Sequence, residues 1–458
     1  MIQRPVVIIG GGAAGTLVAA QLLREAQGPI AVALVERRGR AGHGVAYGTV
    51  DEEHLLNVPA GRMSALPDEP DHFLRWLDDP TATPRDFVPR RRYGDYLRDL
   101  LDASARAAAP GVVLQRIRAE VVDVRPTATG AVVVCLGGER IEARHVVLAI
   151  GNPRAADPPV RGLSFVDDPR YVRDPWRPGA LDHLPRRGPV LLIGAGLTMV
   201  DVALTLARRG AGPFTAISRR GLLPGAHTVP AAPPAGAPVD LPRSLRPLVR
   251  AVRTAIAAGR EWRAVIDGLR PVTQEIWRAL PEGDKRRFLR HVRPYWDRAR
   301  HRMAPQIAAR IQSLCESGVL RVRAARMIDV VVGEAGFRTT LRARGSAQLE
   351  RREFAGIVNC TGPGDTVPAS EDPVVAGLLR NGIIRPGPSG LGLDTADDGA
   401  LVSAAGLPSA WLFTIGPPRK GNLWETTAIP ELREQAGALA ERILWAGAAW
   451  RRNAAGLV

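Results

Sequence analysis

Two segments of the chain share one plan, in which a short apolar strand runs into a glycine-rich turn and then into the start of a helix. The first covers residues 6–15 and the second residues 190–198. Each is followed by the same order of further strands, over residues 111–151 and 318–362, and each series ends in a small residue, a spacer and a glycine. Such a turn binds the phosphates of a dinucleotide at the helix N-terminus. The repetition therefore predicts an α/β fold with two Rossmann-like dinucleotide-binding domains.

The first turn has the spacing G-x-G-x-x-G directly after an apolar strand. In this pattern the first glycine permits a tight turn, the second lets the pyrophosphate approach the backbone, and the third allows the strand and the helix to pack closely. An acid closes the next predicted strand, about twenty residues further on, where it can bind a ribose hydroxyl. The contacts predicted here are Gly10, Gly12, Ala14, Gly15 and Glu36.

The order of the domains favours FAD in the first one, because a flavin domain usually precedes the nicotinamide domain that interrupts it. A polar, turn-rich segment at residues 54–64 is expected beside the flavin ring, with an ordinary surface loop as the alternative. Near the end of the chain, a strand at 411–416 ends in glycine, and the helix after it presents its N-terminus, which stabilises negative charge on a reduced flavin. That helix would also close the sheet. The further FAD contacts predicted are Asn57, Met63, Ser64, Gly151, Gly416 and Thr427.

The second glycine turn lacks a third glycine, because Met199 stands in its place. The next strand, at residues 214–217, ends in Ser-Arg-Arg rather than in an acid. A guanidinium there grips a 2′-phosphate, which an acid would repel, so the pattern favours NADPH over NADH. Solvated surface arginines are the alternative. The contacts predicted for this cofactor are Gly194, Gly196, Thr198, Ser218, Arg219, Arg220 and Gly362.

The domain limits follow from the repeat. We expect the first part of the FAD domain at 1–187, the NAD(P)H domain at 188–362 and the C-terminal return of the FAD domain at 363–458. A helical insertion is predicted within the second domain at about 225–318, with helix ends at Pro271, Pro281 and Pro294. Arginine and histidine side chains of the insertion are candidates to meet a substrate carboxylate, although solvated helix charges are the favoured interpretation of this cluster. These candidates are Arg298, His301 and Arg302.

Composition narrows the function. The net charge is +16, yet the arginines are spread along the chain and only two of the cations are lysines, so a nucleic-acid partner is not expected. The three cysteines form no C-x-x-C, and the histidines have no metal-ligand spacing, which argues against a thiol–disulfide reductase and a metal centre. Neither a signal peptide nor a membrane-spanning run is visible, so we expect a cytoplasmic protein that does not bind membranes.

Several of these segments together resemble a bacterial family of FAD/NAD(P)-binding proteins related to N-hydroxylating flavin monooxygenases, such as the aspartate N-monooxygenase that forms nitrosuccinate. The resemblance implies FAD reduced by NADPH, reaction with O₂ to a flavin C4a-hydroperoxide, and oxygenation of a small polar, amino-acid-like substrate. The matching segments are 44–47, 54–65, 194–201, 218–224, 359–363 and 416–432, with 288–291 and 296–302 in the insertion.

Two other functions stay open. A flavin reductase or dehydrogenase would pass electrons to a quinone or a protein, and a redox-sensing flavoprotein would need no enzymatic step. The stretch 165–175 matches the fingerprint of Baeyer–Villiger monooxygenases only loosely, because Asp167 and Tyr171 stand where glycine and histidine are expected. No catalytic acid or base is identified from the sequence.

Overall fold

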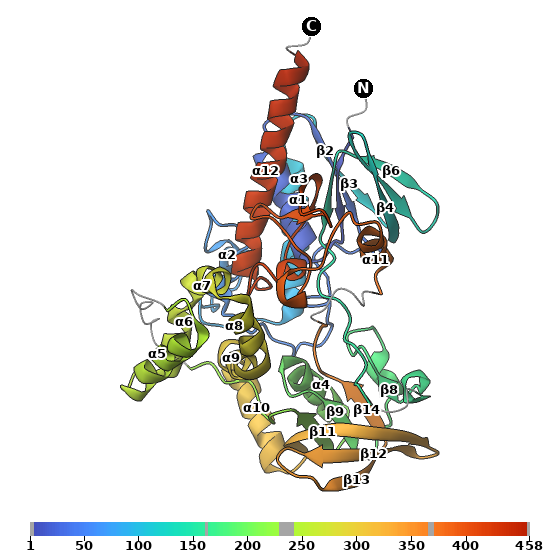
Figure 1. The fold of residues 1–458 in the computed structure, drawn as a ribbon, viewed down its shortest axis with the longest axis vertical. Helices are drawn as coiled ribbons and strands as arrows, with labels where there is room; N and C mark the ends of the chain where they lie inside the picture. The colour runs from blue at the N-terminus through green and yellow to red at the C-terminus, as the bar shows by residue number, and fades with distance from the viewer. Residues whose placement is uncertain (1–3, 161–163, 229–241, 365–370, 456–458) are drawn as a thin grey trace. The chain divides into compact units, whose positions relative to one another are not determined.

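The computed structural model describes residues 4–160, 164–228, 242–364 and 371–455. The chain forms two compact units (Figure 1). Unit 1 comprises Met1–Val50, Val58–Pro153 and Asp365–Val458, and unit 2 comprises Asp51–Asn57 and Arg154–Gly364. Unit 1 is thus interrupted by unit 2, as expected for a flavin domain that receives a nicotinamide domain as an insertion.

Unit 1 is built on a sheet of six strands in the order β15-β16-β7-β1-β2-β3. The strands from β16 to β3 are parallel, and only β15 runs antiparallel, against β16. Every residue of β1 and β7 is buried, as expected for central strands of a parallel sheet that is covered on both faces. The strands are β1 (Val6–Ile9), β2 (Ile30–Val35), β3 (Val112–Ile117), β7 (His145–Leu148), β15 (Ala400–Val402) and β16 (Pro408–Thr414).

Helices and a small second sheet cover this sheet. Helix α1 (Ala13–Glu25) packs against both α3 (Arg90–Ala107) and the long α12 (Ile429–Ala455), and the three lie side by side in Figure 1. Helix α11 (Pro373–Arg380) packs against β4 of the small antiparallel sheet. The remaining elements of unit 1 are α2 (His72–Leu77), β4 (Val121–Thr127), β5 (Gly130–Cys135), β6 (Arg140–Ala143) and the 3₁₀ turns Ala60–Arg62, Pro388–Gly390 and Pro417–Arg419.

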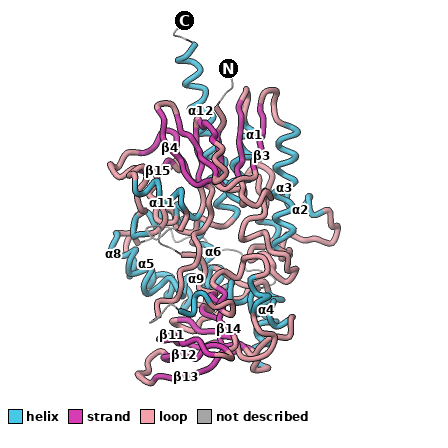
Figure 2. Tube along the Cα trace, turned by 90° about the vertical axis from the view of Figure 1, so that its right-hand side faces the viewer, coloured by secondary structure: helices cyan, strands magenta, loops and turns pink. Residues whose placement is uncertain are grey.

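Unit 2 repeats the plan. Its seven strands have the order β13-β12-β11-β10-β9-β14-β8, so that β14-β9-β10-β11 corresponds to β7-β1-β2-β3 of unit 1. Strand β12 pairs antiparallel with both β11 and β13, and the three strands lie next to one another in Figure 2. The strands are β8 (Tyr171–Val172), β9 (Val190–Ile193), β10 (Phe214–Ser218), β11 (Leu320–Gly333), β12 (Gly336–Ala343), β13 (Leu349–Phe354) and β14 (Gly356–Asn359).

The repeated order confirms the predicted fold class of two Rossmann-like domains. Helix α4 (Leu197–Arg208) follows β9 directly, as α1 follows β1. The predicted helical insertion lies between β10 and β11, and residues 229–241 of its expected proline-rich loop fall outside the described residues. Its helices are α5 (Leu245–Ala257), α6 (Trp262–Gly268), α7 (Thr273–Ala279), α8 (Glu282–Arg287), α9 (Arg293–Arg300) and α10 (Pro305–Glu316), with a π-helical turn at Phe288–Val292 and a 3₁₀ turn at Arg270–Val272. The 3₁₀ turns at Ser164–Asp167 and Ala180–His183 also belong to unit 2 but precede β9.

The prolines of the insertion stand where helices change. Pro271 lies in the 3₁₀ turn between α6 and α7, and Pro281 is the N-cap residue of α8. Pro294 occupies the first turn of α9, directly after the π-helical turn. A proline in a first turn has no intrahelical hydrogen bond to lose, so these positions are compatible with helix starts.

Two short stretches lie in a different unit from the one expected. Residues 154–187 belong to unit 2, because β8 pairs in parallel with β14 and the Asn359 side-chain amide donates to the carbonyl oxygen of Ala156 at 2.9 Å. Residues 51–57 also belong to unit 2, although the chain on both sides of them belongs to unit 1. The repeat alone gave no signal for either exchange, since both depend on contacts between residues far apart in sequence.

Candidate functional site

The first glycine turn is shaped by close backbone contacts. Gly10 has φ = 104°, and a Cβ there would overlap the carbonyl oxygen of Ala149. A Cβ at Gly15 would overlap the carbonyl oxygen of Gly10. Both positions therefore require glycine, as the sequence pattern predicted for a tight turn and for close packing of strand and helix.

This turn fits a dinucleotide phosphate. The N-cap residue of α1 is Gly12, and no side chain caps the helix, so the first-turn N–H groups are left for another acceptor. Glu36, at the end of β2, accepts a hydrogen bond from the Gly11 N–H at 2.7 Å and from the Arg38 N–H at 2.9 Å. These bonds hold an anionic side chain beside the turn, where it can accept from a ribose hydroxyl.

A loop contact that the sequence did not predict supports the turn. The hydroxyl of Thr16 donates to the carbonyl oxygen of Gly11 at 3.1 Å and accepts from the N–H of Gly42 at 3.0 Å. The N–H of Gly42 also donates to the Gly11 carbonyl at 2.9 Å. The 42–48 loop is thus fastened to the glycine turn. A threonine directly after the third glycine is the only signal in the sequence, and many helices carry one.

Of the predicted contacts after β16, Gly416 lies close to the glycine turn. Gly416 has φ = 76°, and a Cβ on it would come 3.8 Å from the Cβ of Ala14. Its N–H donates to Gln435 Oε1 at 3.2 Å, and Gln435 in turn donates to Thr426 Oγ1 at 2.7 Å. Thr427 is exposed just before α12. Gln435 and Thr426 were not predicted from the sequence. No motif indicates that a side chain of α12 bonds to the backbone at the end of β16.

Three other predicted FAD residues have different surroundings. The Met63 side chain is buried in unit 1. The Ser64 hydroxyl is buried too and donates to the carbonyl oxygen of Glu69 at 2.6 Å and to that of Leu66 at 3.1 Å, so it stabilises its own loop. Gly151 has φ = 71°, and no atom lies within 4 Å of the place where its Cβ would stand. Gly151 therefore keeps open space beside the end of β7, which is compatible with a bound ligand.

Asn57 lies in the segment that belongs to unit 2. Asp51, at the start of this segment, accepts from Thr205 Oγ1 on α4 at 2.6 Å and from Arg208 Nη2 at 2.7 Å. Burial raises the pKa of the Asp51 carboxyl, but these bonds and that from the Glu53 N–H outweigh it, and the net pKa is lowered. The segment is thus attached to α4 by a buried, charged network.

The far end of the same segment is attached through a histidine. The carbonyl oxygen of Asn57 lies 3.0 Å from Nε2 of His227. Burial lowers the pKa of His227 to about 4, so the ring is neutral at pH 7, and Nε2–H donates to this carbonyl. The Asn57 backbone is therefore held by unit 2. Its predicted contact with the flavin ring stays a prediction.

The second glycine turn repeats the features of the first. Gly194 has φ = 120°, and a Cβ there would overlap the carbonyl oxygen of Cys360. Gly196 is the N-cap residue of α4 without a side-chain cap, and no atom lies within 4 Å of its Cβ position. The buried Met199 packs where a third glycine is usual, and Thr198 is half-buried in the first turn. Gly362, with φ = 81°, also has open space around its Cβ position. The turn fits a second dinucleotide.

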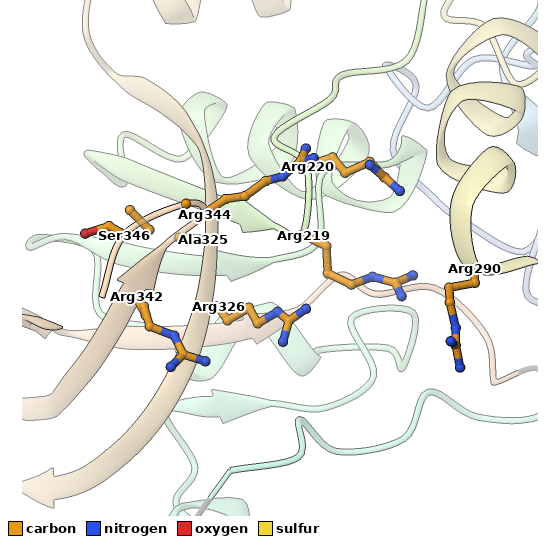
Figure 3. Close-up of a pocket in the computed structure, with 10 residues that line it drawn as sticks. Arg219, Arg220, Arg290, Ala325, Arg326, Arg342, Arg344 and Ser346 are labelled. Carbon is orange, nitrogen blue, oxygen red and sulfur yellow. The ribbon is translucent and has the colours of Figure 1, made fainter. Parts of the chain in front are cut away.

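Arginines gather beyond the end of β10, in a cavity of about 400 Å³ (Figure 3). Ser218 ends the strand, and its hydroxyl accepts from the N–H of Gly221 at 2.9 Å. Arg220 donates to the carbonyl oxygen of His291 and to the hydroxyl of Tyr295, both at 3.2 Å, so it connects the strand end to the insertion. Arg219 extends into the cavity. The arginines that line it are Arg219, Arg220, Arg290, Arg326, Arg342 and Arg344.

The candidate substrate residues do not form one cluster. Arg302 is buried, pairs with the carboxylate of Asp267 and donates to the carbonyl oxygen of Ala299 at 2.9 Å, so its side chain serves the fold. His301 lies 3.8 Å from the carboxylate of Asp297, one turn earlier. Arg298 is exposed. Nothing in the sequence indicated that Arg302 serves the fold rather than a substrate, because its partner Asp267 is distant in sequence.

Fold and turns together define a protein with two dinucleotide-binding domains. Residues 7–153 match the family model described as FAD-NAD(P)-binding, which confirms the predicted cofactor class and the family resemblance of the N-terminal domain. The sequence has no match among functionally curated proteins. Among the helices that the structure describes, none is long and apolar enough to cross a membrane.

Solved structures with the same fold include N-hydroxylating monooxygenases. The ornithine hydroxylase of Pseudomonas aeruginosa, in its reduced form, is 16% identical, with a TM-score of 0.62 over 97% of this chain and 100% of that one. The ornithine N-hydroxylase of Kutzneria sp. 744, described with reduced FAD, NADP⁺ and L-ornithine, is 17% identical, with a TM-score of 0.60 over 96% and 99%. The thioredoxin reductase of Lactococcus lactis is 13% identical, with a TM-score of 0.55 over 97% and 99%. These likenesses confirm the predicted two-dinucleotide fold.

Proposed function

We propose that the protein is an FAD-dependent, NADPH-using monooxygenase that hydroxylates the amine of a small, amino-acid-like substrate. The observation that carries the proposal is the pair of uncapped glycine turns, at α1 and at α4, within a fold that matches the ornithine hydroxylases along nearly the whole chain. Bound FAD would accept a hydride from NADPH and, once reduced, react with O₂.

The cysteines bear on whether the protein could act by thiol–disulfide exchange, as the thioredoxin reductases with this fold do. A thioredoxin reductase needs a pair of neighbouring cysteines that exchange with a disulfide. Cys135 is buried in the core of unit 1, Cys360 is buried in unit 2, and Cys315 lies on α10, all as free thiols. Burial raises the pKa of the Cys360 thiol far above its usual value, which disfavours the reactive thiolate. The thiols therefore do not support thiol–disulfide exchange, and the alternative that stays open beside oxygenation is electron transfer to a quinone or a protein.

Each domain contributes its own residues. The α1 turn and Glu36 hold the FAD phosphates and ribose, and the α4 turn holds the pyrophosphate of NADPH. Arg219, at the end of β10, binds the 2′-phosphate, since it lines the arginine-rich cavity beyond that strand. Arg298, exposed on α9, stays the candidate for a substrate carboxylate. The substrate class rests on the ornithine, lysine and cadaverine monooxygenases among the similar structures.

The test compares the amount of NADPH consumed with the amounts of hydroxylated amine and H₂O₂ formed. The FAD-loaded protein is mixed with NADPH, O₂ and one amine at a time, including L-aspartate, L-ornithine, L-lysine and cadaverine, and NADPH loss, hydroxylated amine and H₂O₂ are measured together. We expect one amine to accelerate NADPH oxidation and to yield about one hydroxylated product per NADPH. Oxidation that gives only H₂O₂ with every amine, together with rapid reduction of an added quinone, would support the reductase alternative instead.

A further inference from the structure

The arginine cavity of unit 2 contains more positive charge than one strand end supplies. It is lined by ten residues, of which six are arginines and none is acidic. They come from four places in the chain: the end of β10, the π-helical turn of the insertion, the β11–β12 hairpin, and the connection from β12 to β13. In Figure 3, Arg219 and Arg326 extend into the same space from neighbouring strands. Six guanidinium groups around one cavity are expected to attract an anion.

Two of these arginines are placed directly opposite each other. In the antiparallel register of β11 and β12, Arg326 pairs with Arg342, next to the pair of Ala325 with Ala343. Like charges directly opposite on neighbouring strands destabilise a sheet. Both side chains are exposed, so packing in the core of unit 2 does not require an arginine at either position. The pair therefore points to a ligand that compensates its charge.

Arginines elsewhere on β11 and on β13 show the contrast. Arg323, three residues earlier on β11, pairs with Glu350 at 2.7 Å, and Arg352 contacts the same carboxylate. The hairpin thus supplies an acidic partner for arginines outside the cavity. No ion pair links Arg326 or Arg342 to a carboxylate among the described residues.

The end of β10 is held against this hairpin. Gly221 has φ = 62°, and a Cβ on it would come 2.7 Å from the N–H nitrogen of Ala324, so the chain after Arg220 lies close to β11. The first five residues of β11 also pair in parallel with β10. Arg219 and Arg326 consequently line one cavity, and a guanidinium group is a strong donor to phosphate oxygens.

We propose that Arg326 and Arg342 bind the 2′-phosphate of NADPH together with Arg219, and that this cross-strand pair sets the preference for NADPH over NADH. The inference rests on the proposed use of NADPH. A phosphomonoester carries close to two negative charges at pH 7 and three acceptor oxygens, which matches a guanidinium from β10 and two from the hairpin. The 2′-phosphate would also remove the like-charge repulsion between the paired strands.

The test is a binding measurement that does not depend on turnover. Isothermal titration calorimetry on the FAD-loaded protein compares adenosine 2′,5′-bisphosphate with 5′-AMP for the native chain and for Arg326→Gln and Arg342→Gln. We expect each substitution to weaken the bisphosphate about tenfold and to leave 5′-AMP unchanged. Arg351→Gln is the matched control, because Arg351 is exposed on β13, the strand paired with β12, lies opposite Thr340 and does not line the cavity.

Thermal unfolding without ligand provides the second readout. Removing one arginine of the pair should leave the melting temperature unchanged or raise it slightly, whereas a merely structural arginine would lower it when lost. Unchanged bisphosphate affinity in both variants would overturn the role of the pair and leave NADPH use intact. Equal affinity of the native protein for the bisphosphate and for 5′-AMP would overturn the inference and the NADPH preference together.

Discussion

The carboxylate of Asp51 accepts a hydrogen bond from the hydroxyl of Thr205 at 2.6 Å, across 154 positions of the chain. His54 Nε2 lies 2.9 Å from the same hydroxyl, so Thr205 joins both side chains of the segment to α4. This relationship makes residues 51–57 part of unit 2. The segment leaves unit 1, is attached to the nicotinamide domain and returns.

Loss of the Thr205 hydroxyl should destabilise this attachment. In Thr205→Val the buried carboxylate of Asp51 loses one of its donors, and a buried acceptor without its partner costs about 1–3 kcal/mol. Urea unfolding should therefore show a free energy of unfolding lower by about that amount. Thr127→Val is the control, since Thr127 is exposed at the end of β4, and it should change stability by less than about 0.5 kcal/mol. Equal stability of both variants would contradict a stabilising network.

Protonation of His227 should loosen the other end of the segment. Because its folded pKa, about 4, lies below the unfolded value of about 6.5, the unfolded chain takes up the proton first as the pH falls. The contribution of His227 is thus complete above about pH 6.5 and is lost toward pH 4, by at most about 1.4 kcal/mol per pH unit. The melting temperature of the native protein should fall more steeply over this range than that of His227→Gln. Parallel pH profiles would show that His227 does not titrate in this way.

A methyl group at Gly15 should prevent flavin retention. The Cβ of Gly15→Ala would overlap the Gly10 carbonyl oxygen, so the turn must change shape and its N–H groups no longer converge on a phosphate. The purified variant should lose its flavin absorbance relative to protein absorbance. Gly437→Ala is the matched control in α12, where no atom lies within 4 Å of the added Cβ, and it should retain flavin and gain about 0.5–1 kcal/mol of stability. Full flavin content in Gly15→Ala would refute the role of the turn.

The glycine turns show how far the sequence could predict this molecule. Gly10, Gly15 and Gly194 have the backbone conformations or close contacts that their spacing implied, because a missing side chain is a local requirement that the sequence states directly. Asn57 and Arg302 show the opposite. Their partners, His227 and Asp267, are far away in the chain, and only the fold determines that these groups meet. Local geometry was therefore predictable, and long-range pairing was not.

The arginines after β10 were predicted together, yet their surroundings separate them. Both arginines line the cavity, but Arg220 also donates to the His291 carbonyl and the Tyr295 hydroxyl, with its guanidinium 4.9 Å from the Tyr295 ring centroid. We therefore expect unequal effects from two single substitutions.

Arg219→Gln should raise the KM for NADPH about tenfold and leave the KM for NADH nearly unchanged, because only NADPH has the phosphate that loses a charge-assisted bond. Arg220→Gln should change the ratio of the two KM values less and should lower the melting temperature, because the variant loses the connection between the end of β10 and the π-helical turn. Steady-state kinetics with both coenzymes and thermal unfolding check this for each variant. A larger shift in coenzyme preference from Arg220→Gln than from Arg219→Gln would reverse the assignment and make Arg220 the phosphate-binding residue.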